Sequence, residues 1–122
     1  MKNNIAAVVV LYNPDKNFIN NIYTYINQVS LLIVVDNSEN PDHSFYNLVQ
    51  KEQNVKFIIN NENTGIAKAV NTGVQFASAQ GFEWALLMDQ DSFFEEKMIQ
   101  TYLAGFNELT DKRTVAVIGP SI

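Results

Sequence analysis

Two aspartates one residue apart form the strongest chemical signal in this sequence. Asp89 and Asp91 follow the apolar stretch ALLM at residues 85–88. Residues two apart in an extended segment point the same way, so both carboxylates can be directed at one volume. A divalent cation relieves their mutual repulsion, and Mg²⁺ or Mn²⁺ suits carboxylate oxygens combined with phosphate oxygens. The pattern therefore favours a metal site that stabilises negative charge on a diphosphate group.

The same stretch supports other interpretations. A bare D-x-D is a common pattern, and Asp91 could simply end a strand. Ser92 and Glu95 fit a capping box, in which Ser92 bonds the backbone of the next helix and Glu95 reaches back; we favour this role for Ser92. The motif LLMDQDS also resembles the strand-D-x-D signature of haloacid-dehalogenase-like phosphatases, in which Asp89 would be the nucleophile. That family carries the signature on its first strand, whereas here it lies near the end of the chain.

The elements that position these acids follow from the hydrophobic pattern. Continuous apolar runs, typical of strands covered on both faces, occur at residues 5–12, 31–36, 55–59, 83–88 and 114–119. Helical spacing of apolar residues predicts helices over residues 18–29, 43–52, 66–79 and 95–108. This alternation predicts one α/β domain over residues 1–122, with a mainly parallel sheet flanked by helices. Small residues on the helix at 66–79 would let it lie close to the sheet.

Polar clusters follow the predicted strands. They are Tyr12-Asn13, Asp36-Asn37-Ser38, residues 60–65 and residues 89–92. Ligands of open α/β sheets bind outside the carboxyl ends of the strands, where an acid such as Asp36 often accepts hydrogen bonds from a nucleotide. Polar loops are also what any such connection requires. Four of them on one rim nevertheless favour a binding site.

Composition and missing motifs exclude several classes of function. The net charge of -5 argues against nucleic-acid binding, which needs clustered basic side chains. The absence of cysteine excludes disulfides, zinc-thiolate sites and thiol nucleophiles. The segment YNPDKN stands where a dinucleotide-binding domain has its glycine-rich loop. No apolar run approaches the ~20 residues of a membrane span, so we expect no integral membrane segment and a cytoplasmic location, with peripheral association at the inner face of the membrane as an alternative.

Four ordered motifs, VVVLYNPD, IVVDNSEN, NENTGIAKAVNTG and LLMDQDS, resemble family-2 glycosyltransferases with the GT-A fold. The resemblance covers nearly the whole chain and is greatest to the rhamnosyltransferase-type branch. It implies a Rossmann-like domain that binds a nucleotide-diphosphate sugar, such as a dTDP- or UDP-sugar. It also implies metal-assisted transfer of a sugar such as rhamnose, with inversion, to a glycan or lipid-linked acceptor in polysaccharide assembly.

The resemblance also implies roles for individual residues. Tyr12 and Asn13 would line the base pocket, and Asp36 would recognise the pyrimidine. Asp89 would face the donor's ribose and the metal, and Asp91 would hold Mg²⁺ or Mn²⁺ on the diphosphate. The implied donor-binding residues are Tyr12, Asn13, Asp36, Asn63, Gly65, Asn71 and Asp89. Ordinary structural roles compete with these, such as a tight turn for the glycine among them.

The general base of the family is expected well downstream of Asp91, in the acceptor-binding half. The chain ends at Ile122, so the resemblance implies that residues 1–122 are the donor-binding portion of a longer enzyme, without its general base. We expect this portion to bind donor and metal but to transfer sugar poorly. A non-catalytic nucleotide-binding module is a further alternative.

Overall fold

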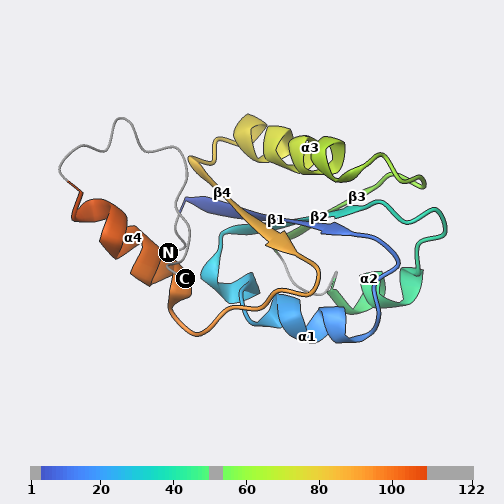
Figure 1. Ribbon diagram of the computed structural model, residues 1–122, viewed down its shortest axis with the longest axis horizontal. Coiled ribbons are helices and arrows are strands. Elements are labelled where there is room, and N and C mark those ends of the chain that lie inside the picture. The colour runs from blue at the N-terminus through green and yellow to red at the C-terminus, as the bar shows by residue number, and fades with distance from the viewer. Residues whose placement is uncertain (1–3, 50–53, 110–122) are drawn as a thin grey trace.

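The computed structural model describes residues 4–49 and 54–109, which form a parallel sheet with helices on both faces (Figure 1). The strands are β1 (Ile5–Leu11), β2 (Leu31–Asp36), β3 (Val55–Ile59) and β4 (Trp84–Asp89). Their order in the sheet is β3-β2-β1-β4, and all three pairings are parallel. The predicted α/β fold and parallel sheet are confirmed. The strand predicted at residues 114–119 lies outside the described residues.

The helices divide between the two faces of the sheet. Helix α3 (Ile66–Ala79) covers one face, while α1 (Asn17–Tyr23), the 3-10 helix η1 (Ile26–Gln28) and α2 (His43–Val49) lie on the other (Figure 1). Helix α4 (Met98–Asn107) follows β4 and contributes Ile99 to the core on the α1 side. With helices on both sides, β1 is buried along its whole length. None of the helices in the described residues has the length and apolar character needed to cross a membrane.

Helix α3 lies very close to the sheet, as its small residues predicted. Ala69, Gly73 and Ala77 form its buried face. A Cβ atom built on Gly73 would lie 2.4 Å from Cγ1 of Val8, so no side chain fits between the helix and β1 at this point. Ile66 does not share this burial, contrary to the apolar pattern, because the first turn of α3 extends past the sheet and leaves the side chain 63% exposed.

Two helix predictions are wrong in their boundaries. The helix expected over residues 18–29 ends at Tyr23 and continues only as the 3-10 turn η1. The helix expected from residue 95 begins at Met98, after Lys97 in a left-handed conformation with φ 62, so the capping box at Ser92 does not form.

Tertiary hydrogen bonds explain the later start of α4. The Phe94 N–H donates to Oγ1 of Thr24 at 2.8 Å, and Nε2 of Gln28 donates to the Glu95 carbonyl at 2.9 Å. In a helix that starts at residue 95, the Glu95 carbonyl would accept the Ile99 N–H; Gln28 binds both groups instead, because its Oε1 accepts the Ile99 N–H at 3.1 Å. The segment between β4 and α4 is held by another element and not by its own secondary structure.

Candidate functional site

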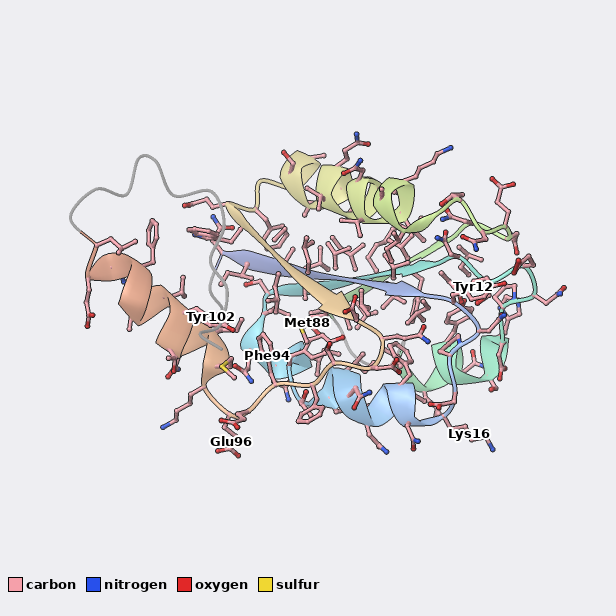
Figure 2. All side chains as sticks on the ribbon, in the orientation of Figure 1. Tyr12, Lys16, Met88, Phe94, Glu96 and Tyr102 are labelled. Atoms are coloured by element: carbon pink, nitrogen blue, oxygen red, sulfur yellow. The ribbon has the colours of Figure 1, made fainter. Side chains whose placement is uncertain are left out.

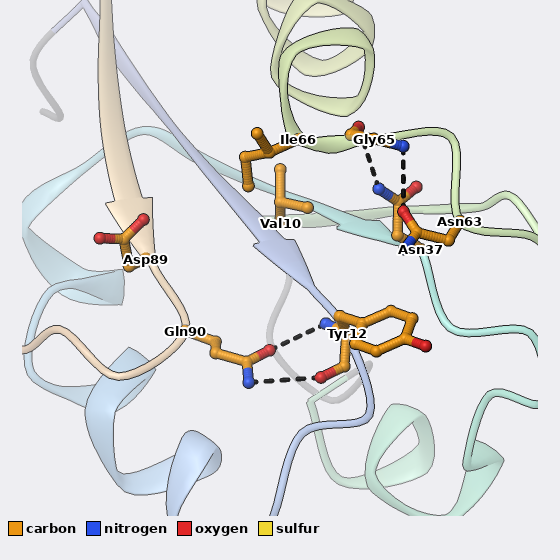
Figure 3. A pocket seen from close by; sticks show the side chains of 8 residues that line it. All are labelled: Val10, Tyr12, Asn37, Asn63, Gly65, Ile66, Asp89 and Gln90. Atoms are coloured by element: carbon orange, nitrogen blue, oxygen red, sulfur yellow. Dashed lines mark hydrogen bonds between the residues drawn. The ribbon is translucent and has the colours of Figure 1, made fainter.

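A pocket of about 330 Å³ opens at the carboxyl ends of the strands. Figure 3 shows the residues that line it, which are Val10, Tyr12, Asn37, Asn63, Gly65, Ile66, Asp89 and Gln90. β2 and β3 lie on one side of β1 and β4 lies on the other, so the strand order reverses at β1. Crevices at such a reversal are where open α/β sheets bind ligands. The position and size of the pocket suit a small-molecule site.

Tyr12 stands just beyond the end of β1 with 44% of its surface exposed. Its hydroxyl donates to Oε1 of Glu39 at 3.1 Å, and this bond to a carboxylate raises the pKa of Tyr12 above its ordinary value. The Tyr12 N–H donates to Oε1 of Gln90 at 2.9 Å. The aromatic ring is therefore an exposed, anchored surface at one end of the pocket, against which a planar group could stack.

Asp36 lies in the interior and not in the pocket. Its side chain is 0% exposed; Oδ1 accepts the Ser38 N–H at 2.8 Å and Oδ2 accepts the Tyr46 hydroxyl. Ser38 in turn accepts the Asn13 N–H through its Oγ at 2.8 Å. Both oxygens of the Asp36 carboxylate thus bind protein groups in the loops behind the pocket, and recognition of a pyrimidine by Asp36 stays a prediction. Asn13 does not line the pocket and belongs to the same network.

Asn37 is the residue at the end of β2 that reaches the pocket. Its Nδ2 donates to the Gly65 carbonyl at 3.2 Å, and its Oδ1 accepts from Asn60 at 2.7 Å and from Thr64 at 3.0 Å. Every polar atom of this side chain is thus bound to the loop before α3. Asn37 shapes the pocket by holding that loop in place.

Gly65 gives the loop its conformation. With φ 86 and ψ 154 it occupies a region that is essentially restricted to glycine. Its N–H donates to Oδ1 of Asn63 at 3.0 Å, which forms a local turn. The structure brings Asn63 and Gly65 into the pocket together with Ile66. Asn71, further along α3, is exposed but does not line the pocket.

Asp89 and Asp91 lie on a turn and not in an extended segment. β4 ends at Asp89, and the Ser92 N–H donates to the Asp89 carbonyl at 3.1 Å. The alternation of a strand therefore does not determine their relative direction. Asp89 lines the pocket; Asp91 is exposed and is not part of the lining. Neither carboxylate has a hydrogen-bond or ion-pair partner among residues 4–49 and 54–109.

The donor atoms of this acidic turn fit a hard divalent cation. Two exposed carboxylates without protein partners provide oxygen ligands of the kind that Mg²⁺ and Mn²⁺ prefer. The described part of the chain contains no cluster of three or more histidine, aspartate or glutamate side chains that could hold a metal. A cation here would need further oxygen ligands, such as those of a bound phosphate.

Reasoning from sequence gave no individual binding role to four lining residues, Val10, Asn37, Ile66 and Gln90, although Asn37 and Gln90 belong to the polar strand-end clusters. The signal for two of them was local. Val10 precedes Tyr12 on the same side of β1 and is the register partner of Asp89, while Gln90 separates the two aspartates. The signal for Asn37 was its place directly after β2, whereas for Ile66 only the path of the loop before α3 determines that it reaches the pocket.

Comparison with known proteins gives the chain a family. The model of Glycosyl transferase family 2 matches residues 6–119. Over 101 residues the chain is 33% identical to the dTDP-rhamnosyl transferase RfbF of Shigella flexneri. The matched segment is 82% of this chain but 33% of that relative, so the chain spans about a third of its relative's length. With its parallel sheet, flanking helices and strand-end pocket, this chain belongs to glycosyl transferase family 2 and has the GT-A fold.

Proposed function

We propose that this chain forms the donor-binding part of a glycosyltransferase that transfers rhamnose from dTDP-rhamnose to a glycan or lipid-linked acceptor. The family and the printed activity of the relative support this proposal. The observation that carries it is the pocket at the strand-order reversal, which combines an exposed aromatic ring, Tyr12, with an exposed acid, Asp89. We place this activity in the cytoplasm, with the full protein at or near the inner membrane face.

The pocket suggests how a donor lies in it. The base lies near Tyr12 and the loop of Asn63 and Gly65, and the diphosphate lies near Asp89. Asn71, five residues after Ile66 on α3, is a further proposed contact for the donor. In this arrangement the deoxyribose lies between the ring and the acids, over Val10. The network of Asp36 supports the base end from behind, without touching the donor.

A divalent cation completes the diphosphate end. Asp89 and Asp91 would hold Mg²⁺ or Mn²⁺, and the bound cation would stabilise the negative charge that develops on the departing diphosphate. The chain's own contribution is to bind and orient the donor so that the acceptor hydroxyl attacks the opposite face of the sugar, with inversion. The group that takes the proton of that hydroxyl lies, in this proposal, outside residues 1–122.

Binding of deoxythymidine diphosphate, with and without Mn²⁺, tests the proposal by calorimetric titration. We expect Mn²⁺ to strengthen binding, and Asp91→Asn to reduce the Mn²⁺-dependent affinity at least about 10-fold, as loss of a metal contact does. The matched control is Glu96→Gln, which removes the same charge from an exposed side chain that lies away from Tyr12 (Figure 2). It should bind as the wild type does.

The alternative functions predict different experimental results. If binding of deoxythymidine diphosphate is unaffected both by Mn²⁺ and by Asp91→Asn, the proposed metal site is contradicted. A phosphatase with Asp89 as nucleophile would form a trappable phosphoaspartate, which the glycosyltransferase proposal excludes. A non-catalytic module would bind the nucleotide, yet the full protein would not turn over dTDP-rhamnose with any acceptor.

A further inference from the structure

Gln90, between the two acids, directs its side chain back to β1. The paired registers of β1 and β4 end at Val10 and Asp89. Beyond this point Oε1 of Gln90 accepts the Tyr12 N–H at 2.9 Å, and Nε2 of Gln90 donates to the Tyr12 carbonyl at 3.4 Å (Figure 3). One carboxamide thus binds both backbone groups of Tyr12, as a neighbouring strand would. The Gln90 side chain thus continues the hydrogen bonding between β1 and β4 by one residue beyond the end of the strand pairing.

The main chain of Gln90 is held as well. Nδ2 of Asn21, on α1, donates to the Gln90 carbonyl at 3.2 Å. Gln90 is therefore fixed through its side chain to β1 and through its backbone to α1. The carboxylates of Asp89 and Asp91 on either side of it are exposed and have no partner in the described part of the chain. The backbone of the acidic turn is thus fixed, while its acids are left available for a ligand.

We propose that Gln90 is a positioning residue that fixes the two acids at a set distance from Tyr12. The inference rests on the proposed function, in which one donor contacts Tyr12 with its base and the acidic turn with its diphosphate. These two ends of the pocket are 78 residues apart in sequence and follow strands whose pairing has already ended. Without the carboxamide, the two loops could shift independently. A displacement of about 1 Å in such a site can cost up to about 10²-fold in function.

A purely structural role for Gln90 makes a different prediction. A neutral hydrogen bond contributes about 1 kcal/mol to folding, and its loss would lower stability without altering ligand binding by molecules that remain folded. A positioning role instead predicts that loss of the Gln90 side chain weakens the effect of Mn²⁺ on the affinity for the diphosphate. The informative quantity is the metal-linked gain, defined as the ratio of the dTDP dissociation constants measured without and with Mn²⁺.

The experiment measures this gain in the full chain for the wild type, Gln90→Leu and Gln90→Glu, at a temperature well below unfolding. Gln90→Leu keeps similar volume and removes both hydrogen bonds, and we expect the gain to fall about 10-fold or more. At about pH 8, the carboxylate of Gln90→Glu faces the Tyr12 carbonyl and cannot donate to it, so this variant should also lower the gain.

The controls are Gln75→Leu and Gln75→Glu, which make the same changes at an exposed position of α3 outside the pocket. Both should retain the wild-type gain. If the wild type shows the gain and Gln90→Leu retains it, the positioning role is overturned. A gain that rises in Gln90→Glu at about pH 8 overturns it too, because the new carboxylate would then act as a simple metal ligand. A wild type that binds dTDP without any metal-linked gain overturns the proposed function itself.

Discussion

At the end of β2, the neighbouring residues Asp36 and Asn37 have different structural roles. Asp36 is buried and binds Ser38 and Tyr46, while Asn37 lines the pocket and binds the loop before α3. Residues next to each other at a strand end point to opposite faces, so the acid expected to contact a ligand faces the protein interior. In this structure the contribution of Asp36 to the pocket is to stabilise the fold and to hold the neighbouring loop.

Two buried tyrosines allow a paired test of this network. Tyr46→Phe leaves Oδ2 of Asp36 buried without its donor, and we expect the free energy of unfolding to fall by about 1–3 kcal/mol. Tyr25→Phe removes a buried hydroxyl that has no hydrogen-bond partner in the described structure, and stability should stay the same or rise by up to about 1 kcal/mol. Urea unfolding of both variants measures the difference. If the two variants lose the same unfolding free energy, the hydrogen bond from Tyr46 to Asp36 makes no specific contribution to stability.

At the scale of elements, two contacts position the pocket. Helix α3 packs directly on β1 and β2 through its small residues, which places its first turn, and the loop before it, over the strand ends. On the opposite side, Thr24 and Gln28 bind the segment that follows the acidic turn, and the Ile99 N–H donates to Oε1 of Gln28 at 3.1 Å. Apolar packing thus places the loop on one side of the pocket, while polar side chains of Thr24 and Gln28 hold the chain that follows the acidic turn.

Replacing Gly73 by alanine tests the close packing of α3. Alanine favours a helix by about 1 kcal/mol over glycine, but the added methyl group would overlap Val8, which is 1% exposed and confined within β1. We expect overpacking to dominate, with a net loss of about 1–3 kcal/mol in unfolding free energy. Gly105→Ala in α4 is the control, since no atom lies within 4 Å of the new Cβ, and it should be stabilising. A stabilising Gly73→Ala would mean that α3 can move away from the sheet at little cost.

For the whole molecule, the fold was largely predictable and the site was predictable only in part. Continuous apolar runs identified β1, β2 and β3, and apolar spacing together with small residues identified α3, because these patterns reflect burial directly. The start of α4 was not predictable, since Thr24 and Gln28 compete for its backbone groups from a distance. Strand-end position brought Tyr12 and Asp89 to the pocket, but the burial of Asp36 depends on Tyr46, which the sequence does not link to it.

Alkaline pH should destabilise the folded chain through its buried phenols. Burial raises the pKa of Tyr25 and of Tyr46, the latter also through Asp36. Below about pH 10 both phenols are neutral whether the chain is folded or unfolded, so their contribution is fully present. Above about pH 10 the two phenols ionise in the unfolded chain before they ionise in the folded chain. The unfolding free energy then falls by about 1.4 kcal/mol per pH unit for each tyrosine, until the pH reaches the raised pKa of the folded state.

The variant Tyr25→Phe isolates one of these two contributions. Between about pH 10 and pH 11, the unfolding free energy should decline by about 1 kcal/mol less in Tyr25→Phe than in the wild type, because the unfolded tyrosine is about half ionised at the start of this range. An identical slope in the two proteins would indicate that the phenol of Tyr25 ionises as readily in the folded chain as in the unfolded one.

The location of β1 between β2 and β4 also has a consequence for the order of events during synthesis. β1, β2 and β3 can pair as soon as the first half of the chain has left the ribosome. The pairing of β1 with β4, and the contact of Tyr12 with Gln90, must await residues made 78 positions later. Such distant pairings form slowly. Nascent chains shorter than this would lack Asp89 and Gln90 of the pocket, so nucleotide capture on stalled ribosomes would mark the chain length at which the pocket first binds.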